Sequence, residues 1–291
     1  MKNDADLINF LRLGVGNATD MYLWALAQIV NQSRNMPLGE VPFLNSSNVE
    51  VDHKPQPKPQ PGDVIQDGDG YPELVVLPGG SFEMGSNDYL DEQPVHTVCI
   101  REFAMGKYPI TQAQWMKVMG NNPSYFTGDD RLPVENVSWD DVQAFIHKLN
   151  RLTGHTYYLP SEAESEYACR AGGTLEYCFG INKRQLSQYA WYRSNSNDQT
   201  QPVGKKKPNA FGLHDMHGNV WEWCEDAWHG NYQGAPEDGR AWRDGGNQEY
   251  RVLRGSSWAD DPLYLRSSNR NGNTASTKYG NIGFRVARAL S

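Results

Sequence analysis

Near the start of the chain, hydrophobic positions recur at helical spacing. Leu7 and Leu11 belong to one group, Leu23 and Leu26 belong to a second, and residues 14–17 divide the two. This pattern predicts two short helices within residues 4–32. Two short helices cannot bury a core by themselves, so we expect them to pack on the rest of the chain or on another copy of it. Self-association into a homo-oligomer is the favoured interpretation.

From residue 71 onward the pattern changes to short apolar runs bounded by glycine, proline and polar residues, which is typical of strands. Three helical patterns follow, and each is preceded by a hydroxyl residue that can cap its first turn, namely Thr111, Ser138 or Ser161. The later loops are rich in Gly, Asn, Trp and Tyr. The sequence therefore predicts an α+β fold with much irregular loop structure, with strands at 73–77, 81–85, 97–100 and 103–105 and helices ending near 119, 152 and 171.

A proline-rich run separates these two parts of the chain. Every second residue from Pro55 to Pro61 is proline, which favours an extended polyproline II rod. We interpret the run as a spacer, with a ligand for a proline-reading module as the alternative. The predicted organisation is a helical segment at 1–52, a Pro-rich linker at 53–70 and a domain at 71–291.

The C-terminal part contains a segment without a hydrophobic period, lying between predicted strands at 251–258 and 281–288. Its residues are mostly small, polar or tyrosine, as in antibody paratopes, where tyrosine supplies rigid contact area and small polar residues supply adaptable hydrogen bonds. This composition favours binding over catalysis. The predicted ligand-binding residues are Trp258, Ala259, Asp260, Asp261, Leu263, Tyr264, Ser268, Asn271, Gly272, Asn273, Ala275, Ser276, Tyr279 and Gly280.

Composition and charge narrow the function classes. The chain has 291 residues and a net charge of −8, so nucleic acid is not an expected partner. The segment from 251 to 288 is locally basic, with six arginines and Lys278 against Asp260 and Asp261; some of these arginines are expected to brace the scaffold through ion pairs. No apolar run is long enough for a membrane span. No secretory signal is recognised at the start, so we expect cytoplasmic synthesis, with a phage particle or non-classical export left open as the final location.

The four cysteines, Cys99, Cys169, Cys178 and Cys224, contain no CxxC pair. A zinc ribbon is therefore not expected. The favoured interpretation is buried free thiols, with one disulfide bridge among them as the alternative.

Several motifs together resemble the formylglycine-generating enzyme family, over about residues 71–288. They are PGGSFEMGS at 78–86, KYPITQAQW at 107–115, LPVENVSW at 132–139, LPSEAE at 159–164 with YACRAG at 167–172, NAFGLHDMHGNVWEW at 209–223, RGSSW at 254–258 and NIGFR at 281–285. The resemblance implies an elaborated C-type lectin fold. It does not cover the first 70 residues.

The residues of this chain do not match the family's oxidase. That enzyme needs two cysteines after its Arg-Gly-Gly-Ser motif to bind copper, for which thiolates are suitable ligands, and residues 251–291 contain none. The related sulfoxide synthases hold iron with histidines from an added helical domain, and residues 1–70 contain only His53. These departures imply that no catalytic cofactor is present. The alternative is a metal-dependent oxidoreductase of this superfamily that uses non-cysteine ligands, and a third class is an adaptor that uses the fold only for assembly.

A third branch of the family fits better. Proteins diversified by retroelements present a variable region at the end of this fold, framed by motifs similar to those at 251–258 and 281–285. Mutation of adenines in AAC codons yields Asp, Tyr, Ser, Gly, Thr, Ala and Leu, which are the residue types found here. Ser256 stands in place of the second glycine and Lys278 does not derive simply from AAC. The resemblance implies a receptor-type variable protein whose C-terminal surface binds an unknown protein or surface ligand. Its expected aromatic anchors are Trp258, Tyr264 and Tyr279 and its polar readers Asp260, Asp261, Asn271 and Asn273.

The resemblance also implies a structural calcium site. Asp215, Gly218, Val220 and Glu222 match family positions that hold calcium through carboxylates and backbone carbonyls, which suits this hard cation. The alternative is that Glu222 pairs with an arginine and binds no metal. His214 and His217 lie beside this motif, and a turn that separates them is favoured over a transition-metal site.

Overall fold

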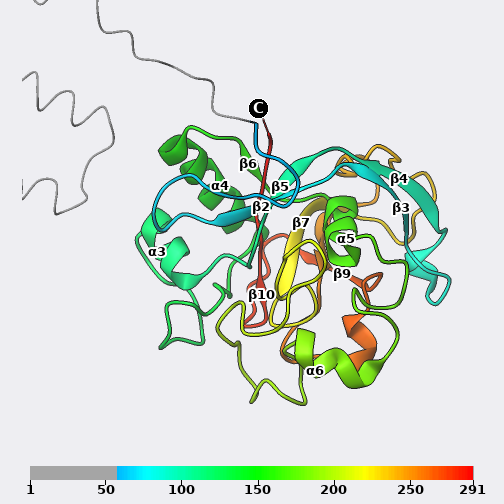
Figure 1. Cartoon of the computed structure of the whole chain (residues 1–291). Coiled ribbons are helices and arrows are strands. Elements are labelled where there is room, and N and C mark those ends of the chain that lie inside the picture. Colours follow the sequence, from blue (N-terminus) through cyan, green and yellow to red (C-terminus); the bar gives the residue numbers. More distant parts are fainter. Residues whose placement is uncertain (1–57, 291) are drawn as a thin grey trace, which may run out of the picture. The chain divides into compact units, whose positions relative to one another are not determined.

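The computed structural model describes residues 58–290. The predicted N-terminal helices, their self-association and most of the proline run lie outside the described residues. Within them, a five-stranded antiparallel sheet has the order β1 (Val64–Gln66), β2 (Glu73–Leu77), β5 (Phe103–Gly106), β11 (Ala287–Arg288) and β6 (Tyr157–Tyr158). The last strand of the chain lies between β5 and β6, so it joins elements that are far apart in sequence (Figure 1).

A second sheet carries the C-terminal motifs. Its order is β10 (Ile282–Gly283), β7 (Trp221–Trp228), β8 (Asn247–Arg254) and β9 (Arg270–Thr274); β10 runs parallel to β7 and the other pairs are antiparallel. A separate hairpin consists of β3 (Gly80–Met84) and β4 (His96–Ile100). The strands predicted between residues 73 and 105 are confirmed within a residue or two at their ends.

The helices begin where the capping hydroxyls predicted. They are α3 (Gln112–Met119), α4 (Trp139–Thr153) and α5 (Glu162–Arg170), preceded by Thr111, Ser138 and Ser161, each of which forms a reciprocal capping box. The short α6 (Leu186–Tyr189) and the 3₁₀ turns η1 (Leu90–Glu92), η2 (Lys183–Gln185) and η3 (Pro262–Leu265) lie in the loops. Of the helices between residues 58 and 290, none combines the length and apolar character that a bilayer crossing needs.

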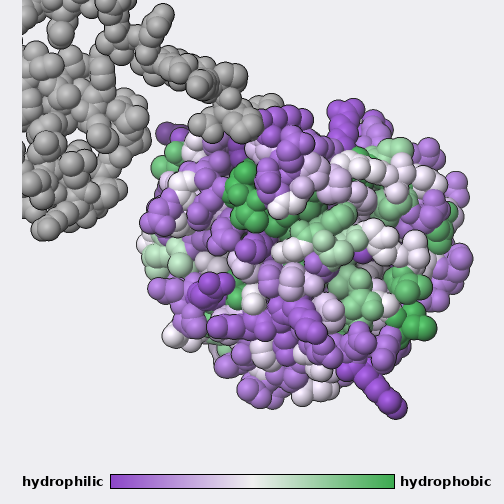
Figure 2. Space-filling model, viewed as in Figure 1, coloured by the Kyte–Doolittle hydropathy of each residue, from purple (hydrophilic) through white to green (hydrophobic). Residues whose placement is uncertain are grey.

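Two buried clusters form the core. One packs α3 and α4 against both sheets through side chains such as Trp115, Phe145, Trp223 and Phe284. The other packs α5 against the β3–β4 hairpin and β5. On the face shown in Figure 2, hydrophilic residues cover most of the surface, and hydrophobic residues gather in the half that carries β3, β4 and α5 in Figure 1.

Several sequence-based boundaries differ from the structure. The strand predicted at 251–258 is β8, which ends at Arg254, and the strand predicted at 281–288 is divided into β10 and β11. β1 lies inside the predicted linker. It forms because Val64 and Ile65 pair with β2, and the sequence did not predict it because three residues are too few to show a hydrophobic period. β9 and η3 lie inside the segment in which the sequence shows no hydrophobic period. The residues of β9 are mostly polar, and its pairing with β8 holds it in place.

Candidate ligand-binding surface

The segment after β8 is a tightly hydrogen-bonded loop. Ser256 has a positive φ of 63° and its hydroxyl donates to the carbonyl of Tyr264 at 2.5 Å. The backbone N–H and hydroxyl of Ser257 both donate to Oδ2 of Asp260, at 2.9 and 2.6 Å. Trp258 Nε1 donates to the carbonyl of Gly280 at 2.9 Å, which ties the two ends of the predicted variable region together. The side chains of Trp258 and Asp260, which the sequence assigned to ligand binding, therefore also help to fix the shape of this loop.

Part of the predicted ligand-binding set lines a cavity of about 440 Å³. Asp260, Tyr264 and Asn271 contribute to it, and Tyr264 is 48% exposed. The volume lies in the range of small-molecule sites. The remaining lining residues, which the sequence did not predict, are Tyr89, Asp91, Glu92, Trp221, Asn269 and Arg270. Tyr89 to Glu92 come from a loop near the start of the domain, and a single sequence carries no signal that places this loop against β9.

A second group of predicted residues joins an aromatic cluster. The ring of Trp258 meets Phe126 edge-on at 5.4 Å between centroids, and Phe126 meets Tyr125 at 4.9 Å. Tyr125 is 77% exposed and Tyr279 is 56% exposed. Sequence reasoning did not predict Tyr125 or Phe126, which belong to the loop after α3 rather than to the C-terminal segment.

Other members of the predicted set serve the fold. Ser268 is 5% exposed, and its hydroxyl accepts from Arg266 at 2.9 Å. Asn273 Oδ1 accepts from the Thr274 N–H and the Thr277 hydroxyl, each at 2.9 Å. A side chain at Gly272 would place its Cβ 2.7 Å from the Trp228 ring. Free variation at these three positions is therefore not compatible with the packing around them.

We expect the exposed and the hydrogen-bonded positions to respond differently to substitution. Leu263→Ser, Tyr264→Ser and Tyr279→Ser should each change the free energy of unfolding by less than about 0.5 kcal/mol. Asp260→Ala should cost about 1 kcal/mol, because it leaves the N–H of Ser257 without its acceptor. Urea denaturation of each variant measures both effects. Equal losses at Asp260 and Tyr264 would contradict the distinction.

The basic charge of this segment is mostly internal. The five arginines of the segment that bind a carboxylate are buried, and all of their partners come from earlier parts of the chain: Arg254 with Glu162 and Glu166, Arg266 with Glu92, Arg270 with Glu162, Arg285 with Glu222, and Arg288 with Asp67. These ion pairs confirm the prediction that arginines of this segment brace the scaffold.

The predicted calcium residues surround a different contact. Both carboxylate oxygens of Glu222 accept from Arg285, at 3.0 and 2.9 Å. Asp215 accepts from the Gly204 N–H through Oδ2, and its buried Oδ1 has no partner. Burial raises the pKa of Asp215 to about 6. As they lie, these residues do not fit a calcium ion, because a guanidinium already occupies the Glu222 carboxylate.

We therefore expect EDTA to leave the melting temperature unchanged. Arg285 neutralises Glu222 without a metal, so removal of calcium should cost nothing. Thermal unfolding with EDTA and with added CaCl₂ measures this. A melting temperature that rises with calcium concentration would show instead that Glu222 leaves Arg285 for the ion.

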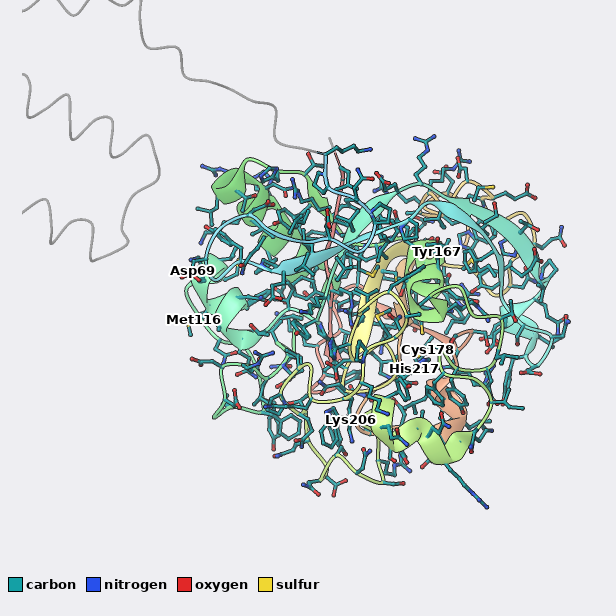
Figure 3. The ribbon with its side chains drawn as sticks, in the orientation of Figure 1. Asp69, Met116, Tyr167, Cys178, Lys206 and His217 are labelled. Atoms are coloured by element: carbon teal, nitrogen blue, oxygen red, sulfur yellow. The ribbon has the colours of Figure 1, made fainter. Side chains whose placement is uncertain are left out.

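The two histidines of this motif point to different partners. His214 Nδ1 lies 2.8 Å from the carbonyl of Lys206, and His217 Nδ1 lies 2.8 Å from that of Leu265. Cys169 Sγ is 3.8 Å from His217 Nε2. The Cys178 N–H donates to the same nitrogen at 3.3 Å, and the two residues lie side by side in Figure 3. All four cysteines are free thiols, as predicted; Cys169 and Cys224 are buried, whereas Cys178 is half-buried and Cys99 is exposed. Among the described residues, no three His, Cys, Asp or Glu side chains are grouped so that they could hold a metal ion.

Beneath the aromatic cluster lies a buried carboxyl group. Glu135 is 0% exposed; its Oε1 accepts from the Phe126 N–H at 2.8 Å and its Oε2 has no partner. Burial raises the pKa of Glu135 from 4.5 to about 7. The folded state therefore favours the protonated form, which adds stability at low pH that is lost as the pH rises through 7.

We expect Glu135→Gln to be more stable than the unmodified protein at pH 8, by on the order of 1–2 kcal/mol, and to lose this advantage at pH 5. The neutral amide avoids a buried charge at pH 8 while its oxygen still accepts from Phe126. Urea denaturation from pH 5 to pH 8 measures the difference in the free energy of unfolding, with the variant Glu249→Gln at an exposed position as control. A pH-independent difference would contradict the titration of Glu135.

Comparison with known proteins agrees with the fold described above. A family model described as the sulfatase-modifying factor enzyme 1-like domain matches residues 61–290.

The chain belongs to this family.

The proteins that the chain resembles include PvdO, a variable protein and a formylglycine-generating enzyme. The solved structure of PvdO from Pseudomonas aeruginosa has a TM-score of 0.73 and 37% identity, covering 80% of this chain and all of that one. Treponema denticola variable protein 1 has a TM-score of 0.71 and 29% identity, covering 78% of this chain and 98% of that one. A formylglycine-generating enzyme of Mycobacterium tuberculosis is 30% identical over 52% of this chain and 73% of its own length. These relatives confirm the predicted α+β fold of the formylglycine-generating enzyme type.

Proposed function

We propose that this protein is a receptor-type ligand-binding protein and not an oxidase. The observation that carries the proposal is the separation of roles within residues 251–288. Buried Arg254 donates to the carbonyls of Ser267 and Ser268, while the side chains of Leu263, Tyr264 and Tyr279 are about half exposed. Tyrosine is one of the residue types enriched at the energetic centres of binding interfaces and in antibody paratopes. Such a surface can change its side chains and keep its fold.

We propose further that a retroelement diversifies this surface. The similarity to Treponema denticola variable protein 1 supports the idea, as do the framing motifs and the residue types between them. Sequencing the DNA that flanks the native gene tests it. We expect a near-copy of codons 251–288 beside a reverse transcriptase gene, differing only where the copy has adenine.

The packing predicts where those differences fall. They should include Leu263, Tyr264 and Tyr279 and should spare Arg254 and Arg270, whose guanidinium groups are buried on Glu162. Absence of any such copy would contradict diversification and would leave an ordinary family member with a fixed binding surface.

The absence of oxidase activity can be tested separately. Purified protein loaded with copper should not convert the cysteine of a sulfatase-derived peptide to formylglycine under oxygen, because residues 251–291 contain no thiolate to hold Cu(I). Mass spectrometry of the peptide gives the answer, with an active formylglycine-generating enzyme as positive control. Turnover, or iron or copper retained stoichiometrically by the purified protein, would favour the oxidoreductase that uses non-cysteine ligands.

The proposed multivalency concerns the N-terminal segment. Self-association through residues 1–52 would raise avidity without any new contact at the binding surface. Analytical ultracentrifugation of the full chain and of residues 58–291 tests this proposal. The same monomeric mass for both would overturn it.

A further inference from the structure

The 440 Å³ cavity beside Tyr264 includes residues that lie far from the variable segment in the sequence. Tyr89, Asp91 and Trp221 line it, and all three lie outside residues 251–288, so diversification would leave them unchanged. The chemistry of this cavity deepens the proposed function and rests on it. Whatever group these residues recognise should be common to the ligands of different variants.

A buried amide that no protein atom satisfies lines this cavity. Asn269 is 8% exposed, and its Nδ2 has no hydrogen-bond partner among the described residues. The next residue, Arg270, directs its guanidinium to Glu162. Side chains alternate along a strand, so Asn269 and Asn271 lie on the opposite side, and both line the cavity. An unpaired buried donor raises the free energy of the folded protein, and an acceptor on a ligand would lower it again.

An indole ring lies on the same face of the sheet. Glu222 is in register with Arg254, and Arg254 with Arg270, so these three side chains share one face. Their neighbours Trp221 and Asn271 therefore share the other face. Trp221 is 5% exposed and lines the cavity. The unsatisfied amide is thus accompanied by apolar surface.

Two carboxylates line the cavity without a cationic partner. Among residues 58–290, neither Asp91 nor Asp260 has a lysine or arginine within ion-pairing distance. Asp260 accepts from Ser257 through Oδ2, which leaves Oδ1 for a ligand. The exposed Arg193 beside this loop pairs with Asp261 at 3.2 Å instead. The lining therefore carries negative charge that the protein does not neutralise.

The cations of the lining and its support are already paired. Arg270 donates to both oxygens of Glu162 at 2.7 Å and to two backbone carbonyls at 2.8 Å. Arg266 lies 2.6 Å from Glu92. An anionic ligand would find no available guanidinium in this cavity, whereas the unpaired carboxylates favour a cation.

We propose that this cavity binds the free amino terminus of a peptide or protein ligand. The terminal ammonium donates to the carboxylates of Asp91 and Asp260, and the carbonyl of the first residue accepts from Asn269 Nδ2. An apolar first side chain lies against the aromatic part of the lining. A lysine side chain has no acceptor beside its ammonium, so it would leave Asn269 unsatisfied. A free amino acid brings a carboxylate that the two aspartates repel.

Three small probes separate the parts of this interaction. Phenylalaninamide carries the ammonium, the carbonyl and an apolar side chain, whereas N-acetylphenylalaninamide lacks the charge and 2-phenylethylamine lacks the carbonyl. The full chain is titrated with each by NMR or calorimetry at about pH 6, which keeps the α-ammonium protonated. Phenylalaninamide should saturate below about 10 mM, and the other two should bind about tenfold more weakly.

Two outcomes of this titration would overturn the proposal. One is no saturable binding of phenylalaninamide, and the other is equal affinity for the three probes. Phenylalanine itself should also bind more weakly than its amide, and equal affinity would contradict the choice of a peptide terminus. The test of diversification by sequencing beside codons 251–288 does not depend on these results, so failure of the cavity proposal is distinguishable from failure of the proposed function.

Two variants assign the groups. Asp91→Asn should weaken phenylalaninamide about tenfold and leave N-acetylphenylalaninamide unchanged. Asn269→Leu should remove the preference for phenylalaninamide over 2-phenylethylamine without lowering the melting temperature, since Nδ2 has no protein partner to lose. If Asn269→Leu lowered the melting temperature and kept that preference, Asn269 would be structural and the proposal would be wrong.

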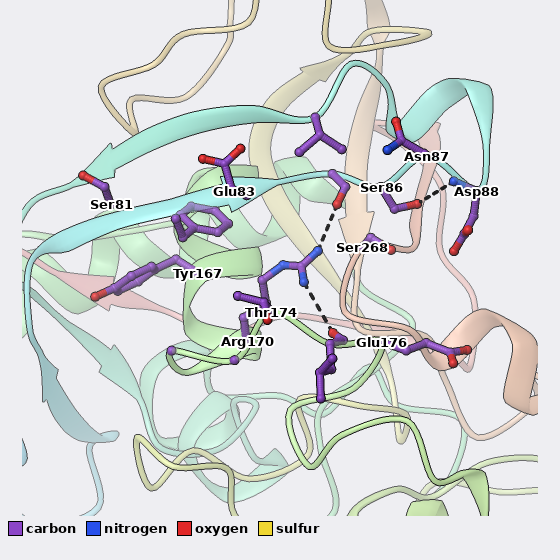
Figure 4. Close-up of a pocket in the computed structure, with 16 residues that line it drawn as sticks. Ser81, Glu83, Ser86, Asn87, Asp88, Tyr167, Arg170, Thr174, Glu176 and Ser268 are labelled. Atoms are coloured by element: carbon purple, nitrogen blue, oxygen red, sulfur yellow. Dashed lines mark hydrogen bonds between the residues drawn. The ribbon is translucent and has the colours of Figure 1, made fainter.

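Glu83→Gln is the matched control. Glu83 lines a separate hollow of about 500 Å³, shown in Figure 4, which shares no lining residue with this cavity. The arginine of that hollow, Arg170, donates to Glu166 and to the carbonyls of Gly85 and Leu175. Glu83→Gln should bind all three probes as the unmodified protein does. Loss of binding in Glu83→Gln but not in Asp91→Asn would place the ammonium in the other hollow and contradict the proposal.

Discussion

Glu162→Gln is expected to destabilise the domain by about 3–5 kcal/mol, the usual cost of breaking a buried ion pair by removing one charge. Glu162 is 3% exposed at the start of α5. It accepts from Arg270 at 2.7 Å through each oxygen, from Arg254 at 3.3 Å and from the Tyr232 hydroxyl at 2.9 Å. Glutamine offers one acceptor oxygen and no charge, so buried Arg270 loses its carboxylate partner, whereas Arg254 keeps only Glu166.

The electrostatics agree with this expectation. Burial alone would raise the pKa of Glu162, but Arg270 and Arg254 outweigh burial and hold the pKa below its usual 4.5. The carboxylate is therefore charged in the folded protein at neutral pH, and its stabilising contribution is lost only when the pH falls below that range.

Urea denaturation at pH 7 measures the loss, with Glu237→Gln as the control because Glu237 is exposed. The double variant Glu162→Met with Arg270→Met should recover part of the stability, since apolar residues can replace a buried pair that loses both charges. If Glu162→Gln were as stable as the control, the arginines would have found other partners. The ion pairs of Glu162 would then not be what holds the variable segment in place.

Gly218→Ala is expected to destabilise the domain by about 3 kcal/mol or more, or to prevent folding. Gly218 has a φ of 88°, and an added Cβ would lie 2.1 Å from the carbonyl oxygen of Trp191. That oxygen accepts from the Asn219 N–H, and the Gly218 N–H donates to the carbonyl of Gly255 where the variable segment begins. The methyl group would therefore displace backbone on both sides of the turn.

Gly212→Ala is the matched control. Gly212 has a similar φ of 81°, but nothing lies within 4 Å of an added Cβ, so only the backbone strain of about 1 kcal/mol should remain. The difference between the two variants in thermal and urea unfolding isolates the clash with Trp191. Equal effects at the two glycines would mean that the turn at Gly218 moves freely, and that the variable segment does not depend on it.

Much of the scaffold follows from local sequence. The hydroxyls of Thr111, Ser138 and Ser161 determine where α3, α4 and α5 begin, because a cap bonds to backbone groups only three residues away. The apolar run at 73–77 forms a central strand for a similarly local reason. The motifs that identify the family are also contiguous in sequence. Fold class and family could therefore be predicted from the sequence.

The set of residues that line the proposed binding surface could not be predicted in this way. Asp260, Tyr264 and Asn271 line one cavity with Tyr89 and Asp91. Long-range bonds hold that segment in place, from Arg270 to the carbonyl of Asp91, 179 positions away, and from Arg266 to Glu92. Burial of Ser268 and the Trp228 ring beside Gly272 remove two positions that composition alone assigned to the ligand. In the same way, Glu222 has a carboxylate suitable for calcium, and only the fold brings Arg285 to it. Residue type and spacing along the chain determined which elements form. The tertiary structure decided which polar groups face solvent, because their partners lie far away in the sequence and burial is a property of the whole packed domain.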